Sequence, residues 1–367
     1  MLDSCNNCVL VVDDTEANVD ILVESLGNDY EVRVAMDGTA ALEQVIQEAP
    51  DIILLDVMMP GIDGYEVCRR LKASDKTREI PIIFLTAMND AQDEAKGLSL
   101  GAVDYITKPF NPDLVKARVR NHLDLKRHRD HLEKLVNERT KDLALLQEAT
   151  IESMAALAEY RDPETGGHIR RTKNYVLLLA KYLKEHNKFP DVLNDESIEL
   201  MYKSAPLHDI GKVGVSDNIL LKPGKLTDEE FNEMKKHTLY GRDTILTALK
   251  RLGENSFLRF AREIAETHQE KWDGSGYPHG IKGENIPVAG RLMAIADVYD
   301  ALISKRVYKV PFSHAKAVSI IKEGKGTHFD PDMVDAFLAL EDEFRKVALK
   351  FADFEEEKQA LAKPLNA

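Results

Sequence analysis

The strongest constraint on the fold is a series of short, continuous apolar runs within the first 120 residues. These runs cover residues 9–12, 51–56, 81–87 and, more weakly, 102–108. Helix-like stretches such as NVDILVESL and GYEVCRRLKAS separate them. Short apolar strands that alternate with helices are typical of a parallel sheet covered on both faces. We therefore predict a doubly wound α/β domain over residues 1–122.

The next segment, residues 123–157, has the pattern of one long helix. Gly and Pro are absent from it, and charges of both signs alternate with leucines. Apolar residues recur at three- and four-residue steps, interrupted by Arg129 and Arg139, and form a seam of Leu125, Leu132, Val136, Leu143, Leu146 and Leu157. Such a seam favours a linker that forms a parallel homodimer stalk, although a helix packed within its own chain would show it too.

Residues 158–350 lack a convincing strand pattern and consist of amphipathic helical segments, for example 227–252, joined by loops rich in His, Asp, Gly and Pro. We predict an all-α domain there and a polar tail, 351–367, that frays. The chain is thus expected to be multidomain, with an α/β domain, a helical linker and an all-α domain.

Composition narrows the possible partners and location. The formal net charge of −14 argues against DNA and against a membrane surface as partners, because the summed field repels polyanions. Neither a leader-like start nor an apolar run of membrane-spanning length is present, so we expect a cytoplasmic protein without membrane insertion. Cys5 and Cys8 form a lone CxxC, which we interpret as incidental rather than as a metal or redox site.

Polar side chains lie where the apolar runs end. Asp13 and Asp14 follow the first run, Asp56 ends the second, and Thr86 and Lys108 end the later two. The carboxyl ends of parallel strands meet at one edge of the sheet, where three carboxylates would repel each other unless a cation such as Mg²⁺ bound them. A hydroxyl and an ammonium at the same edge suggest a site that holds a phosphoryl group on Asp56.

The strings VLVVDD, LLDVMMPGIDGYE, FLTA and TKPF closely resemble the receiver domain of two-component response regulators, over about residues 6–122. The resemblance implies that a sensor histidine kinase phosphorylates Asp56 and that Asp13, Asp14 and Asp56 bind Mg²⁺. It also implies that Thr86 and Lys108 respond to the aspartyl phosphate. Tyr105, three residues before Lys108, is either a packing residue or an aromatic side chain that moves with Thr86.

The all-α region carries a second set of polar residues beside glycine-rich turns or within apolar helices: His168, His208, Asp209, His237, His268 and Asp297. Unpaired polar groups would be costly in such places, so convergence on metal ions is the simpler explanation. Imidazole mixed with carboxylate suits iron or manganese at least as well as zinc. Because His208 and Asp209 are adjacent, the carboxylate could bridge two cations, a geometry suited to phosphoester hydrolysis.

Basic residues accompany this second set. Lys212 follows His208 by one helical turn and is a candidate for offsetting charge on a phosphate or aiding the leaving oxygen. Arg306 and Lys309 follow Asp297 and would suit contact with a phosphate.

The strings HDIGK, THQEKWDGSGYP and AIADVYDAL resemble the HD-GYP family of cyclic di-GMP phosphodiesterases, over about residues 150–345. The resemblance implies that the six residues of the second set are metal ligands, with Asp209 and Lys212 catalytic, and that Glu164 matches the ligand of a third metal. It further implies that Lys212, Arg306 and Lys309 contact the substrate phosphates, and that Gly276, Tyr277 and Pro278 line the pocket. The products would be pGpG or GMP.

One position departs from the family pattern, since Gln269 replaces the second histidine of the usual HHE string. An amide can offer an oxygen but not an imidazole nitrogen. The favoured interpretation is a response regulator that hydrolyses cyclic di-GMP at two or three divalent metal ions, iron or manganese, under control of Asp56 phosphorylation. The alternatives are a degenerate module that acts by binding a nucleotide or protein, and a phosphodiesterase that prefers cyclic GMP-AMP.

Overall fold

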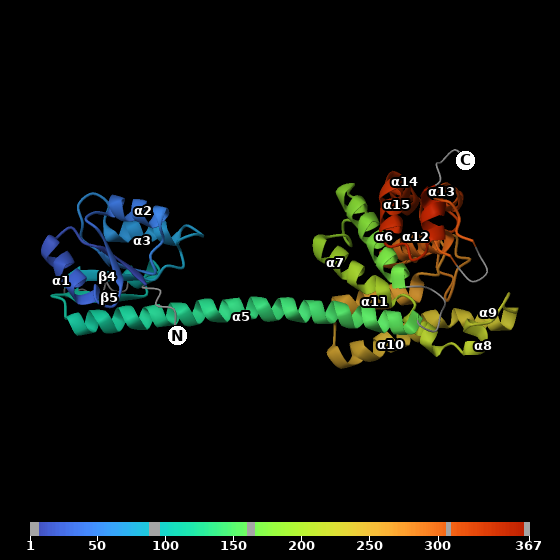
Figure 1. Cartoon of the computed structure of the whole chain (residues 1–367), viewed down its shortest axis with the longest axis horizontal. Coiled ribbons are helices and arrows are strands. Elements are labelled where there is room, and N and C mark those ends of the chain that lie inside the picture. The colour runs from blue at the N-terminus through green and yellow to red at the C-terminus, as the bar shows by residue number, and fades with distance from the viewer. Residues whose placement is uncertain (1–6, 88–95, 160–165, 306–309, 363–367) are drawn as a thin grey trace. The chain divides into compact units, whose positions relative to one another are not determined.

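The computed structural model describes residues 7–87, 96–159, 166–305 and 310–362, which form two compact units, Met1–Lys141 and Asp142–Ala367 (Figure 1). The boundary falls within one helix, α5 (Pro112–Glu159). None of the described helices is both long enough and apolar enough to cross a membrane.

The first unit is built on a parallel sheet with the strand order β2-β1-β3-β4-β5. Its strands are β1 (Cys8–Val12), β2 (Glu31–Ala35), β3 (Ile52–Asp56), β4 (Ile82–Ala87) and β5 (Asp104–Lys108). The other helices of the unit are α1 (Glu16–Leu26), α2 (Gly38–Gln47) and α3 (Gly64–Lys72). This arrangement confirms the predicted doubly wound α/β domain.

Both faces of the central strands are buried, which explains why β1, β3 and most of β4 are apolar, whereas the edge strands β2 and β5 carry charged residues. On one face, side chains such as Leu10 and Ile53 pack against α2 and α3. On the other, their neighbours Val9 and Ile52 pack against α1 and the first part of α5. Figure 1 shows the two layers of helices on opposite sides of the sheet. Because side chains alternate along a strand, a sheet covered twice needs continuous apolar runs.

The linker residues that were predicted to form a seam are exposed along α5. Leu125, Leu132, Val136, Leu143, Leu146 and Leu157 are each 58–71% exposed. Residues elsewhere on the helix are buried: Val115 and Val119 against the sheet, and Ile151 and Ala155 in the second unit. The predicted long helix is therefore present, and its leucine seam faces solvent in the single chain.

The second unit is helical, as predicted. After the end of α5 come α6 (Gly166–Glu185), α7 (Asp195–Ser204), the 3-10 turns η1 (Ala205–Leu207) and η2 (Ile210–Gly214), α8 (Asp217–Leu220), α9 (Asp228–Lys235), α10 (His237–Leu252), α11 (Ser256–Thr267), η3 (Gly283–Asn285), α12 (Val288–Ile303), α13 (His314–Glu323), α14 (Pro331–Ala339), α15 (Glu341–Lys350) and α16 (Glu355–Ala362). Its core packs α6, α7, α11 and α12 against α13, α14 and α15. The most buried helix, α12, is apolar on almost every side.

Two local expectations are wrong. Residues 227–252 do not form one helix, because α9 ends at Lys235 and α10 starts at His237. Between them, the N–H of Lys236 donates to the carbonyl of Glu233, three residues earlier, as in a 3-10 turn. The tail does not fray over 355–362, where α16 buries Leu361. The carboxylate of Glu357 stabilises this docked helix by accepting hydrogen bonds from backbone N–H groups at 305 and 353.

Candidate functional site

The predicted phosphoacceptor residues of the first unit meet at one edge of the sheet. Asp13 follows β1, Asp56 ends β3 and Lys108 ends β5. The ammonium Nζ of Lys108 lies 2.7 Å from a carboxylate oxygen of Asp13 and 2.9 Å from one of Asp56. Asp14 completes a group of three acids whose oxygens lie within 4.8 Å of one another. An all-oxygen donor set at this spacing fits a hard divalent cation such as Mg²⁺.

Burial and the contact with Lys108 distinguish Asp13 and Asp56 from Asp14. Asp56 is only 4% exposed, and this burial raises the pKa of its carboxyl group, although Lys108 opposes the shift. Asp13 is fully buried and accepts hydrogen bonds from Asn18 and from the N–H of Thr15, whereas Asp14 is exposed. The buried carboxylate of Asp56 is thus held against a fixed positive charge.

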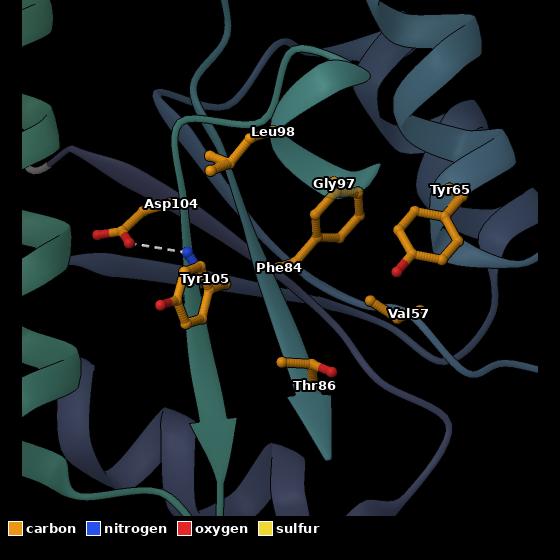
Figure 2. Close-up of a pocket in the computed structure, with 8 residues that line it drawn as sticks. All are labelled: Val57, Tyr65, Phe84, Thr86, Gly97, Leu98, Asp104 and Tyr105. Atoms are coloured by element: carbon orange, nitrogen blue, oxygen red, sulfur yellow. Dashed lines mark hydrogen bonds between the residues drawn. The ribbon is translucent and has the colours of Figure 1, made fainter. Parts of the chain in front are cut away.

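Thr86 and Tyr105 line one small pocket beside this edge (Figure 2). Thr86 sits on β4, one residue beyond Leu85, which pairs with Asp56 across the sheet. Tyr105 lies on the neighbouring strand β5. The other lining residues are Val57, Tyr65, Phe84, Gly97, Leu98 and Asp104. Thr86, the predicted switch residue, and Tyr105, for which packing and switching were both considered, therefore line the same cavity.

In the second unit, residues from distant parts of the chain form two donor sets. The first set contains His168 on α6, His208 after η1 and Asp297 on α12. The Nε2 atoms of His168 and His208 lie 3.2 Å apart, and the nearer carboxylate oxygen of Asp297 lies 4.0 Å from Nε2 of His168. Both histidines are buried.

The second donor set contains Asp209, His237 at the start of α10 and His268 at the end of α11. Oδ1 of Asp209 lies 3.3 Å from Nε2 of His237 and 3.5 Å from Nε2 of His268. Its Oδ2 lies 3.3 Å from Nε2 of His208 and 2.8 Å from Nζ of Lys212. One carboxylate therefore lies between the two sets.

The histidine tautomers can be inferred from the backbone. Nδ1 of His208 faces the carbonyl of Ala205, Nδ1 of His237 faces that of Met234, and Nδ1 of His268 faces that of Ile264. A nitrogen that faces a carbonyl carries the proton, so each Nε2 presents a lone pair. Nδ1 of His168 faces a carboxylate, that of Asp300, at 2.8 Å, with the same result. The four imidazoles thus direct lone pairs toward the centres of the two sets.

These facing lone pairs need a cation between them. Oδ1 of Asp209 is buried and has no hydrogen-bond donor among the described residues. Although burial opposes the change, Lys212 and His208 hold the pKa of Asp209 well below its ordinary value, and burial lowers the pKa of His237 to about 4. Burial lowers the pKa of His208, but the carboxylates of Asp209 and Asp297 together outweigh it, so the net shift of the pKa is upward. The donor sets fit divalent cations, and Asp209 would offer one carboxylate oxygen to each set.

Gln269 does not take the place of a third imidazole in these sets. Its side-chain amide donates to Oδ2 of Asp297 at 3.3 Å, and the opposite carboxylate oxygen, Oδ1, is the one nearer His168. The residue that departs from the family pattern therefore fixes the orientation of a donor. The sequence shows only that an imidazole is missing.

The signature loop lies beside the second donor set. The N–H of Tyr277 donates to the carbonyl of Gln269, and the Tyr277 ring packs edge-on against His237 and Phe231. Gly276 has no room for a side chain, since a Cβ there would lie 2.3 Å from the backbone nitrogen of Lys271. Pro278 follows Tyr277 through a cis peptide bond. Glu164, Arg306 and Lys309 lie outside the described residues.

Sequence reasoning missed two buried charged residues, Asp300 and Arg171, which are 1% exposed and contact each other beside His168. The sequence did offer a signal for Asp300, since it lies three residues after Asp297 in a segment that is mostly apolar.

Comparisons with known proteins match both units. A family model described as the response regulator receiver domain matches residues 9–120, and one described as an HD domain matches residues 152–333. A Vibrio cholerae protein named probable cyclic di-GMP phosphodiesterase is 47% identical over 363 residues, which cover 96% of this chain and 82% of that protein.

Two further relatives match with lower identity. The Xanthomonas campestris cyclic di-GMP phosphodiesterase response regulator RpfG is 34% identical, covering 90% of this chain and 87% of its own. A Vibrio cholerae protein named 3'3'-cGAMP-specific phosphodiesterase 2 is 38% identical over 58% of this chain and 38% of its own. From these full-length matches we conclude that the chain belongs to the family of response regulators that join a receiver domain to an HD domain.

Proposed function

We propose that this protein hydrolyses cyclic di-GMP to pGpG or GMP in its helical unit, and that phosphorylation of Asp56 regulates the reaction. The names of the full-length relatives support the substrate. A receiver domain implies a phosphodonor, and we propose a sensor histidine kinase for that role.

The observation that carries the proposal is the buried Oδ1 of Asp209, which faces two imidazole lone pairs and has no hydrogen-bond donor in the part of the chain that the structure describes. A carboxylate placed in this way would be costly unless a cation bound it. Two divalent cations at these sets would polarise water and offset the negative charge of a phosphodiester. We favour iron or manganese because the donors are imidazole and carboxylate. Glu164 is our candidate ligand for a third cation, and Mg²⁺ our candidate at Asp13, Asp14 and Asp56.

The residues around the metal sets have distinct proposed roles. Lys212, held 2.8 Å from Asp209, would bind a phosphate oxygen and stabilise the charge that develops on the leaving group. Tyr277, between Gly276 and Pro278, would close one wall of the pocket beside His237. Arg306 and Lys309 are proposed to hold the second phosphate.

We also propose that the exposed seam of α5 pairs with a second copy of the chain. Six large apolar side chains at three- and four-residue steps, each more than half exposed, would be buried in a parallel coiled coil. A change in the receiver domain could then reach the helical unit through the paired helices.

The proposed function is tested by loading the protein with iron(II) or manganese(II) and following cyclic di-GMP by chromatography. We expect metal-dependent formation of pGpG or GMP, and loss of turnover when a chelator removes the metal. Absence of any product over hours with either metal would contradict the proposal. A parallel assay with cyclic GMP-AMP tests the one alternative substrate that a relative's name favours.

Variants of Gln269 separate an active enzyme from a degenerate binding module. Gln269→Ala removes one hydrogen bond to Asp297, and we expect kcat to fall about fivefold, the equivalent of about 1 kcal/mol. Gln269→His should change kcat by less than about tenfold, because the donor sets are already complete. A natural chain without turnover that gains it only through Gln269→His would favour the degenerate module. Steady-state kinetics on the three proteins provide the comparison.

A further inference from the structure

A buried ion pair, formed by Asp300 and Arg171, contacts His168 of the first donor set. Asp300 lies one turn after Asp297 on α12 and is 1% exposed. Arg171, on α6, donates from Nε to Oδ1 of Asp300 at 2.6 Å and from Nη2 to Oδ2 at 2.9 Å. Oδ2 of Asp300 also accepts a hydrogen bond from Nδ1–H of His168, at 2.8 Å.

This contact fixes both the tautomer and the direction of the His168 ring. With its Nδ1 proton held by Asp300, the imidazole must present a lone pair at Nε2, which points toward His208. A carboxylate behind a ligating histidine restrains ring rotation and increases the basicity of the ligand. The two-point contact with Arg171 in turn holds the Asp300 carboxylate, and a lysine could not reproduce it.

The opposite side of Arg171 binds the C-terminal segment. Its Nη1 donates to the carbonyl of Phe351 at 2.8 Å and to Oδ2 of Asp353 at 3.0 Å. The N–H of Asp353 is bound by Glu357 on the docked helix α16. The guanidinium group is therefore held by the C-terminal segment on one side and by Asp300 and the hydroxyl of Ser304 on the other.

Gly167, next to His168, makes room for this arrangement. A Cβ at this position would lie 2.2 Å from Oδ2 of Asp353, 2.5 Å from Nη1 of Arg171 and 2.6 Å from the carbonyl oxygen of Phe351. The glycine before the histidine is thus required by the contact between Arg171 and the C-terminal segment.

We propose that Asp300 and Arg171 are positioning residues for the first metal ion, and that the segment 351–357 holds Arg171 in place. This inference rests on the metal centres of the proposed function and extends them to the end of the chain. Loss of the segment's contacts should weaken one metal site and leave the other unchanged.

The competing explanation is that this pair only stabilises the fold, and the same unit provides a matched control. Arg291 and Asp330 form another buried pair, with Nη1 and Oδ2 at 2.9 Å, and are 8% and 5% exposed. Arg291 also donates to the carbonyls of Ile286 and Glu284. Asp300→Asn and Asp330→Asn therefore remove equivalent charges, and only the first change reaches a candidate ligand.

The experiment titrates metal-free full-length protein with manganese(II) and measures the affinity of each equivalent, together with the thermal midpoint of unfolding. We expect Asp300→Asn to weaken one equivalent about 10- to 100-fold and to leave every other equivalent, including one bound at Asp13, Asp14 and Asp56, within about threefold. Asp330→Asn should lower the midpoint without weakening either equivalent. Gly167→Ala, which displaces the C-terminal contact without removing a charge, should reproduce the selective loss.

The outcomes separate this inference from the proposed function. If the helical unit of the natural chain binds neither manganese(II) nor iron(II), both are wrong. If it binds metal and Asp300→Asn binds every equivalent as tightly, only the positioning role is overturned. If Asp300→Asn does not fold, Asp353→Asn provides the test, because the Asp353 side chain is 26% exposed. This variant should weaken the same single equivalent about threefold or more. Unchanged binding in that variant would overturn the inference.

Discussion

Asp209→Asn is expected to lower kcat for cyclic di-GMP by about 1,000-fold or more, which corresponds to about 4 kcal/mol. The two oxygens of Asp209 face different donor sets, so the substitution removes a negative charge that would serve a cation in either set. It also removes the negative charge that lies 2.8 Å from Nζ of Lys212. Metal content measured by mass spectrometry should fall together with turnover.

A surface acid of the same unit provides the control. Asp243 pairs with Arg242 on α10, and its side chain is 59% exposed. Exposed ion pairs contribute about 0–1 kcal/mol, so Asp243→Asn should keep full metal content and change kcat by less than about twofold. Full turnover in Asp209→Asn would contradict the proposed bridge between two metal ions.

Gly211→Ala should destabilise the helical unit by about 3 kcal/mol or more. Gly211 lies in η2, two residues after Asp209, and packs against α10. A Cβ there would lie 1.9 Å from the carbonyl oxygen of His237 and 2.3 Å from the backbone nitrogen of Gly241. The added methyl group must push α10 away and would carry His237 out of the second donor set. Urea unfolding followed by circular dichroism measures the loss.

Gly241→Ala is the matched substitution across the same contact. Its Cβ would lie 3.3 Å from the nearest atom, the Cβ of Ala265, so a small shift accommodates it. Alanine also favours the helix over glycine by about 0.5–1 kcal/mol, which offsets part of the cost. Equal destabilisation by the two substitutions would show that close packing at Gly211 is not the cause.

Much of the receiver unit could be predicted from the sequence because its signals are local. The strands β1, β3 and β4 are apolar runs, and the site residues lie at or next to the ends of strands, whereas β2, with Glu31 and Arg33, is not an apolar run and was missed. Parallel strands bring their carboxyl ends to one edge, so Asp13, Asp56 and Lys108 had to meet once the strands were identified.

The helical unit could be predicted less completely because its contacts join distant residues. His168 and Asp300 are 132 positions apart, and Arg171 lies on an amphipathic helix where an arginine is normally a surface residue. The polar tail gave no sign that Glu357 would be buried and would anchor α16. The contact of Gln269 with Asp297 also depends on two separate helices coming together.

The most direct test of the account is anomalous X-ray diffraction from crystals of the manganese-loaded protein. We expect two peaks in the helical unit. One should lie about 2.0–2.3 Å from Nε2 of both His168 and His208, and the other at a similar distance from Nε2 of both His237 and His268, with Asp209 between them. A fully loaded crystal with no peak at these nitrogens would contradict the metal centres on which the proposed hydrolysis depends.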